Sequence, residues 1–123
     1  MSQKRILVVD DDPAMVATLC DILELYQWET IRAADGAEAV ARCRLGDLDV
    51  VLMDIRMPAF DGVEALIAIK EQQPALPVVL VTAVAPAHLL AQAAEHGAFR
   101  ILRKPVDVEE LLQVLNQAMA GVG

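Results

Sequence analysis

The chain has 123 residues, 56% of them hydrophobic and 23% charged, which is enough to bury a core but too little for two independent domains. A formal net charge of −8 and an aromatic fraction of 3% argue against nucleic-acid binding, which uses cationic side chains on phosphates and rings stacked on bases. We therefore expect one folded domain, residues 1–123, whose direct partners do not include nucleic acid.

Apolar runs of strand length alternate with longer segments of helical period, the pattern of repeated βα units. Three of the strand segments are continuous aliphatic runs, which indicates burial on both faces, whereas the second and fifth each contain an arginine and should be less buried. The predicted order is strand Ile6–Val9, helix 13–26, strand Thr30–Ala33, helix 36–45, strand Val50–Met53, helix 62–73, strand Val78–Val81, helix 86–96, strand Phe99–Leu102 and helix 108–120.

Three of the predicted helices begin with the same signal, an aspartate followed three residues later by a glutamate, which resembles a capping box. The pairs are Asp35 with Glu38, Asp61 with Glu64, and Asp107 with Glu110. Helix ends are marked by Gly97 after the fourth helix and by Gln73-Pro74 after the third.

Neither a membrane span nor a secretion signal is expected. The longest apolar stretches, such as Leu76–Ala87, are far shorter than the roughly 20 residues that cross a bilayer. The N-terminal apolar run Ile6–Val9 ends at three acids and is too short for a signal peptide. Cys20 and Cys43 form no metal-binding or redox motif and fall on apolar helix faces, so we expect buried, reduced thiols in a cytoplasmic protein.

Five parallel strands joined by right-handed crossovers predict an α/β fold, a doubly wound sheet with helices on both faces. Ligands bind such sheets outside the carboxyl ends of the strands. The polar residues at those ends are Asp10, Asp11 and Asp12 after the first strand, Asp54 after the third, Thr82 after the fourth and Lys104 after the fifth. We therefore expect the chemistry of the protein at this edge.

A cluster of carboxylates is unfavourable by itself, because two charges about 4 Å apart repel by about 4 kcal/mol at an effective dielectric near 20. A hard cation such as Mg²⁺ suits carboxylate ligands and bridges to phosphate oxygens, and Lys104 could supply a second positive charge. With both charges in place, one aspartate becomes a plausible nucleophile for phosphoryl transfer, forming an aspartyl phosphate.

Each of these residues also has an ordinary structural interpretation. Asp12 precedes Pro13 and suits an N-cap of the first helix, Asp54 could be a cap, and Thr82 and Lys104 could be a plain strand-end residue and a surface charge. The functional interpretation is favoured by the conjunction of these residues: acids after the first and third strands, a hydroxyl after the fourth and Lys-Pro after the fifth.

These motifs resemble the receiver domain of bacterial two-component response regulators, of the kind found in chemotaxis regulators. The resemblance covers nearly the whole chain, through Ile6-Leu7-Val8-Val9-Asp10-Asp11, Asp54-Ile55-Arg56-Met57-Pro58, Asp61-Gly62, Thr82-Ala83, Gly97-Ala98 and Lys104-Pro105. It implies a flavodoxin-like strand order of 2-1-3-4-5 with five helices. It also implies that Asp54 is the phosphoacceptor and that Thr82 and Lys104 contact the phosphoryl group. Mg²⁺ would be bound by Asp10 and Asp11, together with Asp54 and the backbone carbonyl of Arg56. The Lys104-Pro105 peptide is implied to be cis.

The resemblance further implies the partners. The phosphoryl donor would be a phosphohistidine on a sensor histidine kinase, and the phosphorylated surface around the fourth helix, fifth strand and fifth helix would control an output domain or a downstream protein. A homodimer through the same face is left open. Such a domain is a signalling switch and not an enzyme, since it catalyses only its own phosphorylation and dephosphorylation. No effector motif follows within the 123 residues, so the chain is either complete or one domain of a longer regulator.

Two positions depart from the family pattern. Ile101 stands where the family usually has Tyr or Phe, so the aromatic switch is missing and we expect coupling to run through Thr82 and the following loop to an apolar fourth helix. Val84 stands where many members have a polar side chain. Because valine cannot position an attacking water, we expect a comparatively long-lived aspartyl phosphate.

Two other function classes are compatible with part of the sequence. Asp10 and Asp12 have the DxD spacing of haloacid-dehalogenase-type phosphohydrolases, but Ala14 and the absence of length for a capping insertion disfavour that reading. A purely structural dimerisation module is disfavoured by the intact set of Asp54, Thr82 and Lys104. The cognate kinase and the pathway are not encoded in these motifs.

Overall fold

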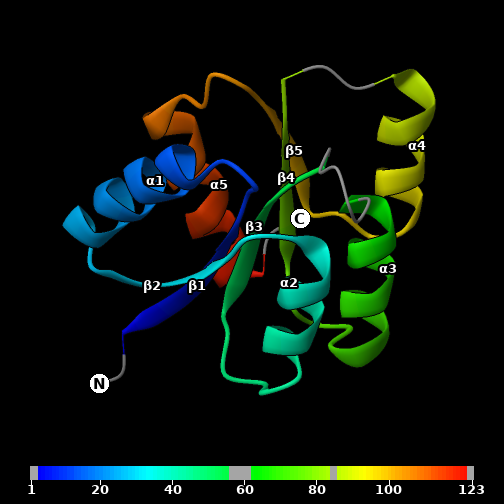
Figure 1. Ribbon diagram of the computed structural model, residues 1–123, viewed down its shortest axis with the longest axis horizontal. Coiled ribbons are helices and arrows are strands. Elements are labelled where there is room, and N and C mark those ends of the chain that lie inside the picture. The colour runs from blue at the N-terminus through cyan, green and yellow to red at the C-terminus, as the bar shows by residue number, and fades with distance from the viewer. Residues whose placement is uncertain (1–2, 56–61, 84–85, 122–123) are drawn as a thin grey trace.

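The computed structural model describes residues 3–55, 62–83 and 86–121, which form five strands and five helices in strict alternation (Figure 1). The predicted order of elements is confirmed, with every end within two residues of the expected position. The elements are β1 (Lys4–Val9), α1 (Pro13–Leu25), β2 (Trp28–Ala33), α2 (Gly36–Cys43), β3 (Val50–Asp54), α3 (Gly62–Gln72), β4 (Val78–Thr82), α4 (Ala87–Glu95), β5 (Arg100–Arg103) and α5 (Val108–Ala120).

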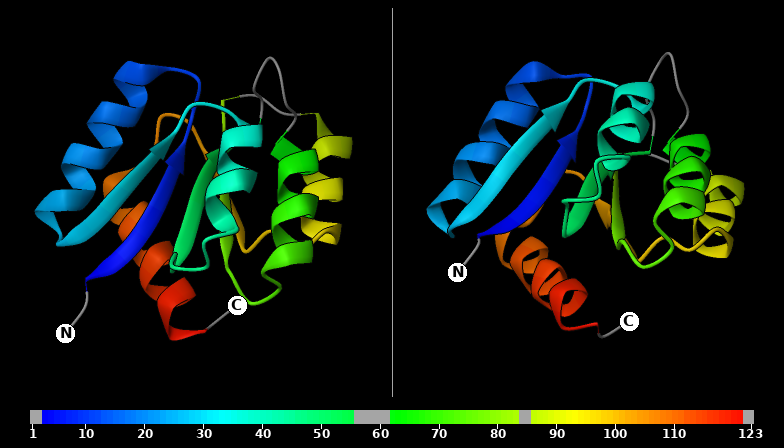
Figure 2. Two further views of the ribbon diagram at one scale, coloured as in Figure 1. Left: turned by 60° about the horizontal axis from the view of Figure 1, so that its bottom comes forward. Right: turned by 90° about the horizontal axis from the view of Figure 1, so that it is seen from below.

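All four strand pairings are parallel, and the sheet has the order β2-β1-β3-β4-β5. Helices α1 and α5 cover one face, and α2, α3 and α4 cover the other (Figure 2). The predicted doubly wound, flavodoxin-like fold is therefore confirmed. Since the winding direction reverses between β1 and β3, the carboxyl ends of these two strands border the crevice where such sheets bind ligands.

The strand burial follows from this topology. Every residue of β3 and β4 is buried, because these strands lie inside the sheet between two helical layers. Side chains alternate between the two cores, so that Val51 and Met53 face α2, α3 and α4, whereas Val50 and Leu52 face α1 and α5. The edge strands β2 and β5 are partly exposed, as their arginines predict.

Aspartate caps define three helix starts. The side chain of Asp12 accepts a hydrogen bond from the backbone N–H of Ala14, and Asp35 and Asp107 accept from the N–H groups three residues further on, at 2.8 and 3.1 Å. The capping interpretation of Asp12 is confirmed, and Asp35 and Asp107 are N-caps as predicted. The reciprocal bond of a capping box is not formed at Asp35, because Glu38 accepts from the N–H of Ala34 instead. Asp61 lies outside the described residues.

Helix α4 is anchored differently from these three helices. Its N-cap is Pro86, with no side-chain hydrogen bond to the first turn, and only Ala93 is buried. It ends at His96, after which Gly97 has a φ of 94°, the left-handed conformation that favours glycine at a helix end. Without a side-chain cap, and with only Ala93 and the partly buried Leu89 packed into the core, α4 is anchored more weakly than these three helices.

Both cysteines are free and buried, as predicted, one in each core. Burial raises the pKa of the Cys43 thiol to about 11, which keeps it protonated and unreactive at neutral pH. In the described segments, no helix is long and apolar enough to cross a membrane.

Candidate functional site

Four strand ends bring polar residues to one edge of the sheet. Asp10 follows β1, Asp54 is the last residue of β3, Thr82 is the last residue of β4, and Lys104 follows β5. The parallel register pairs Asp54 with Val81 and Thr82 with Arg103, and the N–H of Lys104 donates to the carbonyl of Thr82 at 2.8 Å. The strands therefore end at one level, and their polar residues share one crevice.

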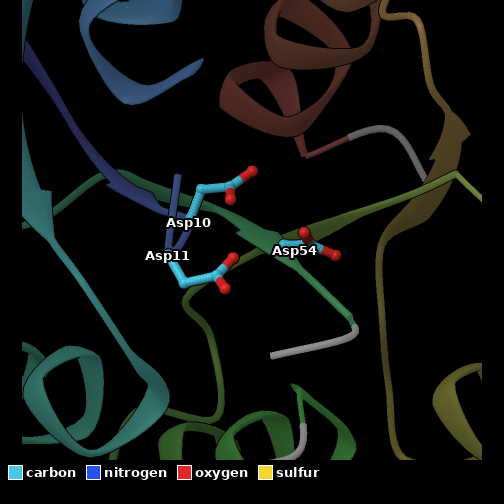
Figure 3. A group of neighbouring side chains, drawn as sticks. All are labelled: Asp10, Asp11 and Asp54. Atoms are coloured by element: carbon cyan, nitrogen blue, oxygen red, sulfur yellow. The ribbon is translucent and has the colours of Figure 1, made fainter. Parts of the chain in front are cut away.

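Three carboxylates form the centre of this crevice. One oxygen from each of Asp10, Asp11 and Asp54 lies within 4.8 Å of the other two. Figure 3 shows the side chains of Asp10 and Asp11 at the end of β1 beside Asp54 on the neighbouring strand. Asp10 and Asp54 are only 5% and 8% exposed, whereas Asp11 is exposed to solvent. Two of the three charges are therefore poorly screened by water.

Lys104 neutralises the two buried carboxylates together. Its Nζ lies 3.0 Å from Oδ2 of Asp10 and 2.9 Å from Oδ2 of Asp54. Partial burial lowers the pKa of Lys104, but the hydrogen bonds and charges of Asp54 and Asp10 outweigh it, so the pKa lies above its usual value. Lys104 is therefore a permanent cation at this site.

Asp11 carries negative charge that Lys104 does not neutralise. Desolvation raises its pKa, and the neighbouring carboxylates of Asp10 and Asp54 raise it further. Within the described residues, no cation pairs with Asp11. The cluster therefore has a surplus of negative charge beside exposed carboxylate oxygens, a donor set that suits a hard divalent cation such as Mg²⁺.

Thr82 brings an unusual hydroxyl to the same edge. Its side chain is fully buried, and its Oγ1 has no hydrogen-bond partner among the described residues. A buried hydroxyl without a partner costs free energy, so it is uncommon in a native protein and points to a group that bonds to an incoming ligand. The sequence marks Thr82 as a strand-end residue but contains no signal for this missing partner.

Gly62, which the sequence indicates only as part of the Asp61-Gly62 motif, is a positioning residue. A Cβ at this position would lie 2.5 Å from Cα and 2.6 Å from the carbonyl oxygen of Ile55, and 2.9 Å from the carbonyl oxygen of Asp54. The N–H of Gly62 donates to the Ile55 carbonyl at 3.0 Å. Only glycine lets the start of α3 approach the backbone that carries Asp54 this closely.

The other residues singled out from the sequence have these positions. Arg56 and Val84 lie outside the described residues. The Lys104-Pro105 peptide is cis. Ile101 is half-buried and packs, with Leu89 of α4, against the core on the α2, α3 and α4 side of the sheet.

The chain is similar to one known domain family and to several individual bacterial proteins. Residues 6–116 match the model of the response regulator receiver domain. The chain is 37% identical over 119 residues to protein PilH of Pseudomonas aeruginosa, covering 95% of this chain and 98% of PilH. It also matches several longer bacterial transcriptional regulatory proteins at 33–37% identity, but spans only about a quarter of their length.

Solved structures agree with this fold. A response regulator receiver domain protein from Methanospirillum hungatei superposes with a TM-score of 0.94 at 30% identity, over 98% of this chain and 97% of that one. The beryllofluoride-activated NtrC4 receiver domain dimer superposes with a TM-score of 0.88 at 30% identity, over 97% of this chain and 98% of that one.

The unpartnered hydroxyl of Thr82 leads to a stability prediction. Thr82→Val keeps the shape of the side chain and removes the unpaired polar group, so we expect the free energy of unfolding to rise by about 1 kcal/mol. Thr82→Ala also removes the hydroxyl but leaves a small cavity, and should be less stable than Thr82→Val. Urea unfolding of the three proteins measures the difference. A valine variant less stable than the wild type would mean that the hydroxyl has a partner.

Proposed function

This chain belongs to the response regulator receiver domain family, and on that premise we propose that it is a phosphorylation-dependent switch with Asp54 as its phosphoryl acceptor. The observation that carries this proposal is the bridge from Lys104 to Asp54 at 2.9 Å, beside the acidic pair Asp10 and Asp11. Asp54 ends the central strand β3, between β1, which leads to the acidic pair, and β4, which ends at Thr82.

The proposed transfer needs no general base, because Asp54 is already a carboxylate held by Lys104. An Asp54 oxygen attacks phosphorus, the new O–P bond forms as the P–N bond of a phosphohistidine on a sensor kinase breaks, and the imidazole leaves. Lys104 can move its ion pair from the Asp54 carboxylate to a phosphoryl oxygen, and the Thr82 hydroxyl can donate to another. The chain contributes position and charge, which supply most of the catalysis in phosphoryl transfer.

We propose that Asp10, Asp11 and Asp54, with the backbone carbonyl of Arg56, hold Mg²⁺. When bound, this ion would neutralise charge on the phosphoryl oxygens. The surplus charge on Asp11 and the close carboxylate oxygens support the assignment. Asp12 is not part of the set, since its carboxylate caps α1. That contact also argues against the phosphohydrolase alternative, in which Asp12 would need a free carboxylate.

We propose that the signal leaves through α4, β5 and α5. Helix α4 has no side-chain cap and one buried residue, so it is the element on this side of the sheet that can shift at least cost. Ile101 packs against the same core as Leu89 and has a stiff χ1, so it should stay in one conformation while Thr82 and α4 move. The long phosphoryl lifetime expected from Val84 stays a prediction, because Val84 lies outside the described residues.

The partners follow from the same proposal. A sensor histidine kinase would supply the phosphoryl group, and an output domain or separate protein would receive the signal, since the chain matches one quarter of longer transcriptional regulators. The dimer of a similar receiver domain supports self-association, for which we propose the face formed by α4, β5 and α5. We further propose that the protein acts in the cytoplasm and that its catalysis is confined to its own phosphorylation and dephosphorylation.

The acceptor assignment can be tested directly. Incubation with Mg²⁺ and phosphoramidate, followed by peptide mass spectrometry, should locate the phosphoryl group on Asp54, and Asp54→Asn should abolish it. Asp12→Asn is the matched control, because asparagine still caps α1 and the variant should be phosphorylated normally. Wild-type levels of phosphorylation in Asp54→Asn would refute the assignment.

Metal binding should appear as stabilisation. At ten times its Kd, Mg²⁺ should stabilise the fold by about 1.4 kcal/mol, which raises Tm by about 5 °C for a domain of this size. Asp11→Ala should lose most of this rise, while Asp21→Ala, an exposed aspartate on α1, should keep it. Differential scanning calorimetry with and without EDTA measures both. An equal rise in Asp11→Ala would show that the ion binds elsewhere.

The proposed path of the signal through α4, β5 and α5 predicts which residues change on phosphorylation. Phosphorylation should alter amide hydrogen exchange most strongly in residues 83–96, because α4 is the weakly anchored helix. Thr82→Ala should block this change, and Ile101→Val should leave it nearly intact. Exchange followed by mass spectrometry compares the three proteins. Loss of the response in Ile101→Val but not in Thr82→Ala would contradict the proposed coupling.

A further inference from the structure

A pocket of about 280 Å³ lies at the end of the sheet opposite to the carboxylate cluster. Its lining comes from the last turn of α3, from the segments that precede β4 and β5, and from the end of α5, which lie together at one end of the fold (Figure 2). The wall includes the apolar side chains of Pro77, Phe99 and Ala118, and one cationic side chain, that of Lys70. The pocket is large enough for a short organic group but too small for a protein segment.

The ammonium group of Lys70 is held by backbone carbonyls. Its Nζ donates to the carbonyl of Pro74 at 2.8 Å and to that of Leu76 at 3.0 Å, and the neighbouring residues Ala75 and Pro77 line the pocket. In the described part of the chain, no carboxylate forms an ion pair with Lys70. Burial lowers the pKa of Lys70, because no negative charge compensates for the water that the ammonium has lost.

These two hydrogen bonds are also compatible with the neutral amine. An amine nitrogen keeps two N–H groups, so both carbonyls can stay bonded after Lys70 has lost one proton. The lone pair then takes the remaining tetrahedral direction, away from the two carbonyls. The amine is therefore held in place with its lone pair free to attack, which is what a nucleophilic lysine requires.

The chain has three lysines, Lys4, Lys70 and Lys104, and they lie in different surroundings. Lys104 is bound by two carboxylates, which keep it charged. Nζ of Lys4 lies 4.9 Å from the centroid of the Trp28 ring, a contact made by a cation with an aromatic face. Among the described residues, Lys70 has neither an anionic nor an aromatic partner. Lys70 is therefore the lysine best suited to react as a neutral amine.

We propose that Lys70 is a site of Nε-acylation by small thioesters, with the acyl chain bound in this pocket against Pro77, Phe99 and Ala118. The pocket provides both parts that the reaction needs, an amine held in place and an apolar wall for the chain. The site is at the opposite end of the sheet from Asp54, so the inference does not depend on phosphorylation.

The transfer is balanced without a further reactant. The nitrogen lone pair of Lys70 attacks the carbonyl carbon of the thioester, a C–N bond forms, the C–S bond breaks, and sulfur leaves as a thiolate with the electron pair. Nitrogen then loses one proton, which the thiolate takes up. The products are an amide at Lys70 and a free thiol.

Acylation would change the connection between α3 and β4. The amide has a single N–H, so one of the carbonyls of Pro74 and Leu76 would lose its donor, and the positive charge of Lys70 would be removed. The stem of Lys70 also lies beside the end of α4, because a Cβ built at Gly97 would be 3.4 Å from Cε of Lys70. The modification would therefore act next to the turn that ends the weakly anchored helix.

The experiment treats the folded protein at neutral pH with the acetyl, propionyl and butyryl thioesters of N-acetylcysteamine, and measures acylation of each lysine by peptide mass spectrometry. Lys70 should be acylated several times faster than Lys4 and Lys104. In urea, where the surroundings of the three lysines are lost, they should react alike. Lys70→Arg should lose the main acylated product, and Lys4→Arg, the matched control, should keep it.

The length of the acyl chain tests the pocket. Burial of each added methylene should raise the rate at Lys70 by up to about fourfold. Ala75→Leu fills the pocket from an exposed position of its wall and should flatten this dependence on chain length. Ala37→Leu is the matched control, because Ala37 is exposed on α2, away from this pocket, and it should keep the wild-type series.

Each outcome decides the inference. Preferred acylation of Lys70 in the folded protein but not in urea, with rates that rise with chain length except in Ala75→Leu, supports the site. Equal acylation of the three lysines in the folded protein, or faster acylation of Lys4 or Lys104 than of Lys70, overturns it. A series that Ala75→Leu leaves unchanged, or wild-type rates that do not rise with chain length, would also overturn it, since the acyl chain would then lie outside the pocket.

Discussion

The bridge from Lys104 to Asp10 and Asp54 is the interaction on which the site depends. Two carboxylates about 4 Å apart repel by about 4 kcal/mol at an effective dielectric near 20, and here both are nearly buried. A single ammonium group within 3.0 Å of both offsets that repulsion. Because Asp10, Asp54 and Lys104 stand at the ends of three different strands, the bridge also links the ends of β1, β3 and β5. Removing one member would leave an uncompensated buried charge, which typically costs about 3–5 kcal/mol.

The rest of the edge is organised around this bridge, at some cost to stability. Thr82 keeps a buried hydroxyl without a partner in the described structure, and Asp11 keeps a carboxylate whose pKa is raised by its surroundings. Position 62 is a glycine, whose lack of a side chain allows the start of α3 to contact the backbone of Asp54 and Ile55. A domain selected for stability alone would have removed all three features. Their combination at one strand edge is typical of a site that is completed by a ligand.

The anchoring of the helices differs in a way that suits a switch. Helices α1, α2 and α5 begin at aspartate caps and bury three or four residues each, whereas α4 begins at Pro86 without a side-chain cap and buries Ala93 only. The rigid helices hold the charged residues in place. The weakly anchored helix lies on the β4 and β5 side of the sheet, where Thr82 and Ile101 are found. A change in hydrogen bonding at Thr82 therefore acts next to the element that resists movement least.

The sequence by itself determined the order of elements, the parallel doubly wound sheet, the aspartate caps of α2 and α5, and the residues at the strand ends. These features depend on local periodicity and on the chemistry of single residues. Contacts across the sheet were decided only by the tertiary structure. The sequence suggested Lys104 as a counter-charge, but the sharing of its ammonium between Asp10 and Asp54 depends on strand register and twist. The close approach of Gly62 to Ile55, the missing partner of the Thr82 hydroxyl and the pocket beside Lys70 likewise depend on distances between segments remote in sequence. No local pattern of residues encodes such distances, since they result from the packing of the whole chain.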